Sequence, residues 1–135
     1  MKRGAPRLEI LWQRVTVGAE TCERCGDTGE SVRRATEQLR QELVPRGIEV
    51  ELTERTLPPF AVEQSNRIFF NGAALEDLLG QSHEVAVGMN HCQSCCDMLG
   101  SQTDCRTLIL DGREYEALPA ELIVRAGRVA AAHLK

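Results

Sequence analysis

Residues 8–17 read LEILWQRVTV, and this stretch decides the fold. Leu8 and Ile10 begin an alternation of apolar residues, and other apolar residues occupy much of the opposite side, as in a strand covered on both faces. Strict alternation over residues 48–53 predicts a second strand with one buried and one wet face, which suits the edge of a sheet. A helical pattern separates the two, so the order strand, helix, strand predicts parallel strands joined by a right-handed crossover.

The predicted helix begins near Asp27, because Asp27 followed three residues later by Glu30 is an N-cap pair. Apolar residues then follow at helical spacing: Val32, Ala35, Leu39 and Leu43. Residues 18–29 are thereby predicted to be a loop, and this loop contains Cys22 and Cys25.

The C-terminal half contains shorter patterns. They are a strand at residues 68–70, a helical turn or second strand at residues 73–79, a hairpin of residues 107–110 and 114–118, and a helix from Pro119 onward. Asp111 and Gly112 predict the tight turn of that hairpin. Residues 80–106 are the most weakly patterned, and four cysteines crowd into them, so we describe this segment as a cysteine-rich insertion.

A length of 135 residues with 42% apolar content suits one hydrophobic core. We therefore expect a single α/β domain over residues 1–135, with a mixed sheet, flanking helices, and the insertion at about residues 80–106 before a C-terminal hairpin and helix. The net charge of −4 argues against nucleic-acid or anionic membrane partners. Charged residues interrupt the one apolar N-terminal stretch, so we expect no secretory signal and a cytoplasmic location.

The six cysteines are the most informative residues, because a reducing cytosol does not favour a purely structural disulfide framework. Cys22-Glu23-Arg24-Cys25 has the spacing of a redox pair, in which a thiolate attacks and the second thiol resolves the mixed disulfide. Arg24 adds a positive charge that favours a thiolate, whereas Glu23 opposes it. The same spacing also suits two zinc ligands.

The order of elements, with Cys22 and Cys25 after the first strand, resembles the thioredoxin and glutaredoxin superfamily. The segment Ser65-Asn66-Arg67-Ile68-Phe69-Phe70-Asn71-Gly72 resembles the glutaredoxin segment in which a cis-proline precedes the third strand. Asn66 takes the proline's place and is expected to be trans, since a non-proline cis bond costs about 2.5–4 kcal/mol. The resemblance implies that Cys22 and Cys25 are catalytic and that Asn66 and Arg24 face the substrate.

The whole chain is also similar to a small uncharacterised bacterial and archaeal family of thioredoxin-like domains of unknown function. The matching stretches are Thr21 to Gly29, Ser65-Asn66-Arg67-Ile68, Leu75-Glu76, Cys105-Arg106 and Tyr115 to Ile123. This similarity implies a thioredoxin-like fold and transfers no activity.

The second group of cysteines is Cys92, Cys95, Cys96 and Cys105, with His91 as a nearby nitrogen ligand. Three or four of them suit a structural zinc site, which would contribute directly to folding. Iron–sulfur ligation ranks below zinc because the spacing is unusual. A disulfide relay to Cys22 and Cys25, a soft ion such as copper(I), arsenic or mercury, and simple burial of Cys96 are the alternatives.

Two functions follow from these residues. The first is a thioredoxin-like thiol–disulfide oxidoreductase that uses Cys22 and Cys25 and acts on a protein or a small thiol or disulfide. The second is a cysteine-ligated metal-binding protein, for which zinc is the candidate cofactor. Neither the substrate nor the oligomeric state follows from the sequence.

Overall fold

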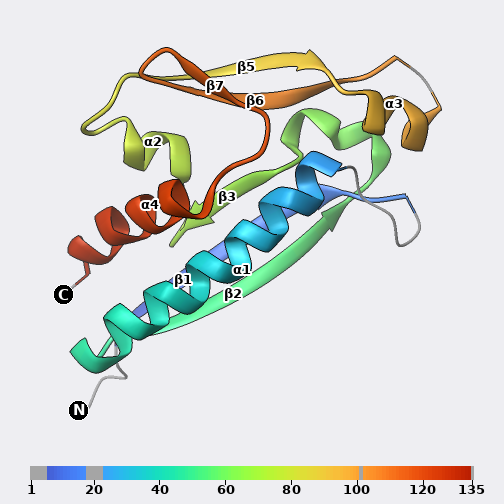
Figure 1. The fold of residues 1–135 in the computed structure, drawn as a ribbon. Helices are drawn as coiled ribbons and strands as arrows, with labels where there is room; N and C mark the ends of the chain where they lie inside the picture. Colours follow the sequence, from blue (N-terminus) through green and yellow to red (C-terminus); the bar gives the residue numbers. More distant parts are fainter. Residues whose placement is uncertain (1–5, 18–22, 101, 135) are drawn as a thin grey trace.

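The computed structural model describes residues 6–17, 23–100 and 102–134 (Figure 1). The first sheet contains β1 (Arg7–Val15), β2 (Glu49–Leu57), β3 (Arg67–Phe70) and β4 (Ala73–Ala74), in the order β2-β1-β3-β4. The second sheet contains β5 (Val85–His91), β6 (Asp104–Leu110) and β7 (Arg113–Tyr115), in the order β5-β6-β7. The helices are α1 (Glu23–Leu43), α2 (Leu75–Leu79), α3 (Gln93–Leu99) and α4 (Ala120–Ala132), with 3-10 turns at η1 (Val44–Arg46) and η2 (Pro59–Gln64).

The first sheet is mixed, because β1 pairs in parallel with β2 and antiparallel with β3. Its parallel register runs from Arg7 opposite Glu49 to Val15 opposite Leu57. The predicted parallel pair is therefore confirmed, and β2 lies at an edge as its alternation indicated. A mixed four-stranded sheet, a second sheet and flanking helices are consistent with a thioredoxin-like α/β fold.

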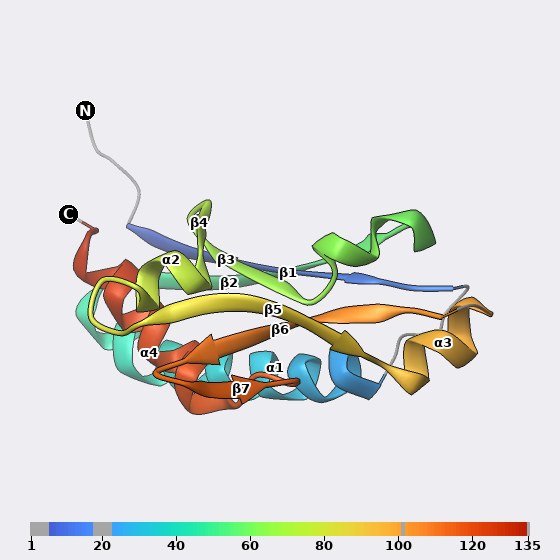
Figure 2. The same ribbon diagram turned by 90° about the horizontal axis from the view of Figure 1, so that it is seen from above.

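Helices α1 and α4 cover one side of the first sheet (Figure 2). Trp12 on β1 is 1% exposed and lies directly under Gly29 of α1, where a side chain would collide with the indole ring. Gly127 of α4 similarly leaves room for Leu39 of α1, since a Cβ there would lie 2.5 Å from Cδ1 of Leu39. These two glycines allow α1 to pack closely against both the sheet and α4.

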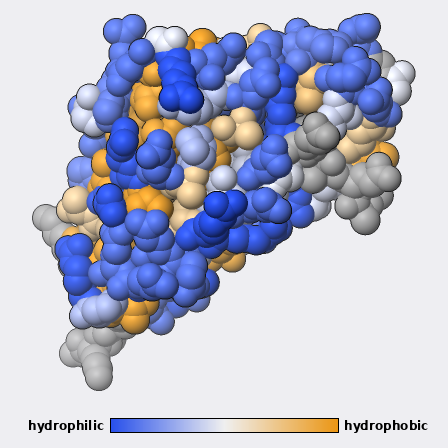
Figure 3. Space-filling view, in the orientation of Figure 1, coloured by the Kyte–Doolittle hydropathy of each residue, from blue (hydrophilic) through white to orange (hydrophobic). Residues whose placement is uncertain are grey.

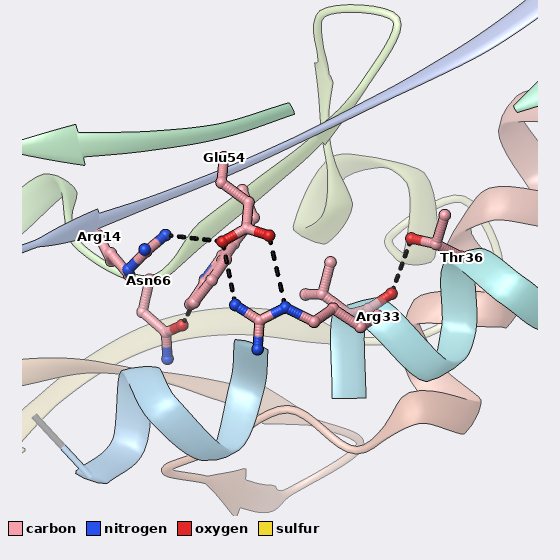
Figure 4. A network of polar contacts seen from close by, with 7 residues as sticks. Arg14, Arg33, Thr36, Glu54 and Asn66 are labelled. Atoms are coloured by element: carbon pink, nitrogen blue, oxygen red, sulfur yellow. Dashed lines mark hydrogen bonds and ion pairs between the residues drawn. The ribbon is translucent and has the colours of Figure 1, made fainter. Parts of the chain in front are cut away.

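Ion pairs also attach α1 to the sheet. Glu54 of β2 accepts hydrogen bonds from Arg14 of β1 and from Arg33 of α1 (Figure 4). Hydrophilic side chains cover most of the surface on this side of the molecule, and hydrophobic atoms gather between the second sheet and α4 (Figure 3). Within the described residues, no helix is both long and apolar enough to cross a membrane.

The prediction that α1 begins near Asp27 is wrong, because the helix already includes Glu23 to Gly26. The buried hydroxyl of Thr28 accepts hydrogen bonds from the Asn66 side chain and from the Leu118 backbone. These tertiary contacts hold the early turns in place, and they outweigh the capping preference of an exposed Asp27. Cys25 therefore lies in the first turn of α1 rather than in a loop.

Residues 80–106 are more ordered than the sequence indicated. They contain β5, α3 and the start of β6, and β5 pairs with β6 from Val85 opposite Leu110 to His91 opposite Asp104. Residues 73–79, which the pattern left undecided, form β4 followed by α2. The predicted hairpin is confirmed, with positive φ at Asp111 and Gly112, although β7 ends at Tyr115.

Glu76 of α2 joins the two sheets. Its carboxylate accepts a hydrogen bond from Arg67 of β3 at 3.3 Å and from Arg106 of β6 at 2.5 Å. All three side chains are largely buried. Because one carboxylate serves two guanidinium groups from different sheets, this polar contact fixes the second sheet against the first.

Candidate metal centre

Three cysteines lie together at one end of the second sheet. The Sγ atoms of Cys92, Cys95 and Cys105 all lie within 4.8 Å of one another, and each side chain is buried. The Sγ atoms of Cys105 and Cys95 are 2.8 Å apart. This three-sulfur cluster brings together residues that the sequence separates by up to thirteen positions.

The cluster is positioned by the start of α3 and by β6. Cys92 is the N-cap residue of α3 and Cys95 lies in its first turn, so the spacing of three residues places both on one side of the helix. Cys105 lies on β6 opposite Asn90 of β5. The backbone N–H of Cys92 donates to the carbonyl of Thr103, which continues the ladder between β5 and β6 beside the cluster.

Thiolates are the natural ligands of soft ions, and zinc binds cysteine sulfur at about 2.3 Å, which separates neighbouring sulfurs by about 3.8 Å in a tetrahedral site. The sulfurs of the cluster are therefore close enough to hold one metal ion. Burial also excludes water, so an ion there would depend on protein ligands rather than on solvent.

The structure does not place Cys96 and His91 in the three-sulfur cluster. Cys96 is partly exposed, and its Sγ accepts the Thr103 backbone N–H at 3.1 Å. The Nδ1 atom of His91 lies 3.9 Å from that sulfur, and its Nε2 atom lies 3.1 Å from the side-chain oxygen of Gln93. These two residues form a separate exposed contact between the end of β5 and α3.

Cys25 lies beside the end of β1. Its side chain is buried, and its Sγ lies 3.2 Å from the hydroxyl of Ser65. That hydroxyl also accepts the backbone N–H of Val15 at 3.0 Å, so its own proton can be donated to the sulfur. Cys22 lies outside the described residues.

Arg24 fastens the first turn of α1 to the end of β5. Its Nη2 atom donates to the carbonyl of His91 at 2.7 Å and to Glu116 at 3.1 Å, and Glu116 also accepts from Asn90. The start of α1 and the α3 segment consequently lie side by side (Figures 1 and 2). Arg24 is thus engaged with protein groups, and one of them, the His91 carbonyl, belongs to the residue that directly precedes Cys92.

Asn66 has a trans peptide bond, as expected, and a positive φ of 59°. Its side-chain oxygen accepts from Trp12 at 3.1 Å, and its amide nitrogen donates to Thr28 at 3.0 Å. In this structure the side chain therefore binds the interior of the protein. The prediction that Asn66 faces a substrate therefore concerns its backbone alone.

Sequence reasoning missed Ser65, Asn90 and Glu116 as neighbours of the cysteines. Ser65 directly precedes the residue that takes the cis-proline position, which is a weak signal that it lies near Cys25. Asn90 and Glu116 carried no signal, since their proximity depends on the pairing of β5 with β6 and on the path after β7.

Comparisons with known proteins agree with the resemblance in the sequence at the level of the family. The family described as a domain of unknown function, DUF2703, matches residues 8–127. A protein from Archaeoglobus fulgidus, described as an uncharacterized protein, is 36% identical over 121 residues, which are 87% of this chain and 82% of that relative. No solved structure matches the chain.

Proposed function

Because the chain belongs to the DUF2703 family, a domain of unknown function, we propose its function from the site: it binds one soft metal ion through Cys92, Cys95 and Cys105. The observation that carries this proposal is the convergence of three buried sulfurs within 4.8 Å of one another. Three buried thiolates would repel one another, and a cation held between them neutralises that charge.

Zinc is the first candidate ion, and copper(I), arsenic and mercury species are the alternatives. A structural zinc site takes four ligands, so zinc would need a fourth donor besides the three-sulfur cluster. Soft ions that accept three thiolates would need no further ligand. The number of bound sulfurs therefore distinguishes zinc from these softer ions. We further propose that the protein works in a reducing compartment such as the cytoplasm, where thiols persist.

The test is metal content per chain by mass spectrometry, on protein purified anaerobically without chelator or nickel affinity. About one ion per chain is expected in the wild type, and Cys105→Ser should lose it. Cys96→Ser is the control, because Cys96 lies next to Cys95 on α3 but outside the three-sulfur cluster.

Two results would contradict the metal proposal. One is a wild-type protein that neither contains metal nor binds zinc or copper(I) in an anaerobic titration. The other is full metal retention after Cys92, Cys95 and Cys105 are all replaced by serine. X-ray absorption at the metal edge would give the number of sulfur ligands and so select the ion.

A second function, thiol–disulfide exchange at Cys22 and Cys25, is favoured by the surroundings of Cys25. This residue lies in the first turn of a 21-residue helix, where the helix dipole favours a thiolate, and the Ser65 hydroxyl can donate to its sulfur. In the proposed reaction, the Cys22 thiolate attacks a partner disulfide and releases one partner thiol. Cys25 then attacks the mixed disulfide, which yields the Cys22–Cys25 disulfide and the second partner thiol.

Reduction of glutathione disulfide by the fully reduced protein tests this reaction. Cys22→Ser should abolish it, and Cys25→Ser should accumulate the mixed disulfide, which mass spectrometry detects. Cys96→Ser again serves as the control and should leave the rate unchanged. An unchanged rate in a protein that lacks both Cys22 and Cys25 would exclude this function.

A further inference from the structure

We propose that the free edge of β5 pairs with β5 of a second copy of this chain, antiparallel, to form one continuous sheet across a two-fold axis. This inference is independent of the metal and redox proposals. It rests on the position of β5, on the direction of its peptide groups, and on its unusual composition for an exposed edge.

The first observation is that β5 is a long edge strand. In the order β5-β6-β7 it has β6 on one side only. It spans seven residues and runs along the outer rim of the second sheet (Figure 1). The other edge strands of the described residues are short, as in β4 and β7, or strongly charged, as in β2.

The second observation concerns the hydrogen bonds of β5. Backbone bonds between Cys92 and Thr103, and between Asp111 and Glu84, fix which residues of β5 face β6. Since alternate residues of an antiparallel strand point to opposite sides, Val87 and Met89 direct their N–H and C=O groups away from β6. Among the residues that the structure describes, no hydrogen bond reaches these outward groups.

The third observation is the chemistry of the edge. Val87 is 47% exposed and Met89 is 45% exposed, and the strand VAVGMNH contains no proline and no Asp, Glu, Lys or Arg. Edge strands are usually protected by charge, by proline or by shortness. The edge strand β2 shows the usual protection, with Glu49, Glu51, Glu54 and Arg55.

A two-fold pairing centred on Gly88 satisfies these groups. It places Val87 opposite Met89 of the partner subunit and Met89 opposite the partner's Val87, in the positions where both strands present outward N–H and C=O groups. The two exposed apolar side chains then cover each other, and no like charges oppose across the axis. The strand is therefore complementary to itself, which is why a second copy is the expected partner.

The experiment is sedimentation velocity of the full chain from micromolar to several hundred micromolar, with amide hydrogen exchange on the same samples. A shift from monomer to dimer is expected as concentration rises, together with increasing protection of the Val87 and Met89 amides. Val87→Lys should weaken the dimer by about tenfold or more, because a buried lysine would face the partner's Met89.

Thr53→Lys is the matched control, since Thr53 is exposed on β2, the other long edge. It should leave the dimer unchanged. Met89→Lys provides a second test on the same edge, and circular dichroism will show whether each variant folds. A wild type that is monomeric at every concentration, or a dimer that both edge lysines leave intact, would overturn the proposal.

Discussion

The two sheets of this protein are held together by different forces. In the first sheet, Leu8, Ile10 and Trp12 are at most 1% exposed and pack under α1 and α4. In the second sheet, β5 is mostly exposed, and only β6 buries apolar side chains, at Leu108 and Leu110. Contacts of another kind add to this burial: the Glu76 carboxylate binds Arg106 of β6, and the sulfurs gather around Cys105. Apolar burial does not depend directly on pH or redox state, whereas ion pairs and thiols do. The second sheet also buries less apolar surface, so we expect it to open first.

The largest expected effect comes from emptying the core of the first sheet. Trp12→Ala should lower the free energy of unfolding by about 3–5 kcal/mol, because it removes a fully buried ring beneath Gly29. Chemical denaturation monitored by circular dichroism will measure the loss. Trp12→Phe, which keeps a ring but loses the bond to Asn66, should cost clearly less.

If the first sheet is the more stable of the two and supports the second, Trp12→Ala should make both sheets unfold more readily. Amides of β1 and of β6 would then gain exchange rate to a similar extent. A variant in which only β1 exchanges faster, while β6 stays protected, would reverse the order of stability that we infer for the two sheets.

The next effect comes from the contact between the sheets. Glu76→Gln leaves two largely buried arginines without a carboxylate and should cost about 2–3 kcal/mol after allowance for partial solvent access. Amides at Leu108 and Leu110 should exchange faster, while the amide of Ile10 changes much less.

Asp77→Asn is the matched control, because Asp77 is an exposed carboxylate on the same short helix. It should leave exchange in both sheets unchanged. Equal acceleration in β1 and β6 by Glu76→Gln would show that the two sheets unfold as one unit.

The smallest effect concerns a surface pair between α1 and α4, both of which cover the first sheet. Hydrogen bonds from the Arg128 guanidinium and the Gln38 amide lower the pKa of Glu42 from 4.5 to about 2. A lowered carboxyl pKa contributes stability above pH 4.5, and this contribution is lost as the pH falls toward 2. Both side chains are substantially exposed, so the contribution should be below about 1 kcal/mol.

Glu42→Gln should therefore lower the unfolding free energy slightly at pH 7 and leave it equal to that of the wild type near pH 2. Glu37→Gln, on the same helix, is the control. A difference between wild type and Glu42→Gln that stays constant from pH 7 to pH 2 would mean that the carboxylate charge plays no part.

The sequence predicted the first sheet well for a physical reason. The residues of β1, α1 and β2 each carry a local period that matches their own burial, so Leu8 and Ile10, or Val32 and Leu39, indicate their surroundings without knowledge of the partner. The start of α1 was the exception, because Thr28 is held by Asn66 and Leu118 from far along the chain.

The candidate site was predicted only in part. The cysteine-rich segment and a three- or four-cysteine cluster followed from spacing, but the choice of Cys105 over Cys96 depends on the register between β5 and β6. In that register, small residues of β5 such as Ala86 and Gly88 lie opposite residues of β6. Such small residues give the sequence of β5 no clear hydrophobic alternation. The contact of Arg24 with His91 likewise could not be read from either segment alone.

The path of the chain between α2 and α4 has an evolutionary consequence. Helix α2 ends at Leu79, helix α4 begins at Ala120, and these two helices pack against each other. Residues 80–119, between these two helices, contain the second sheet and four of the six cysteines. The two ends of this segment adjoin α2 and α4, so they lie close together. A segment with adjacent ends can be inserted or deleted in a gene without disturbing the strands around it. The α/β frame and the cysteine-bearing sheet can therefore have separate ancestries within one reading frame.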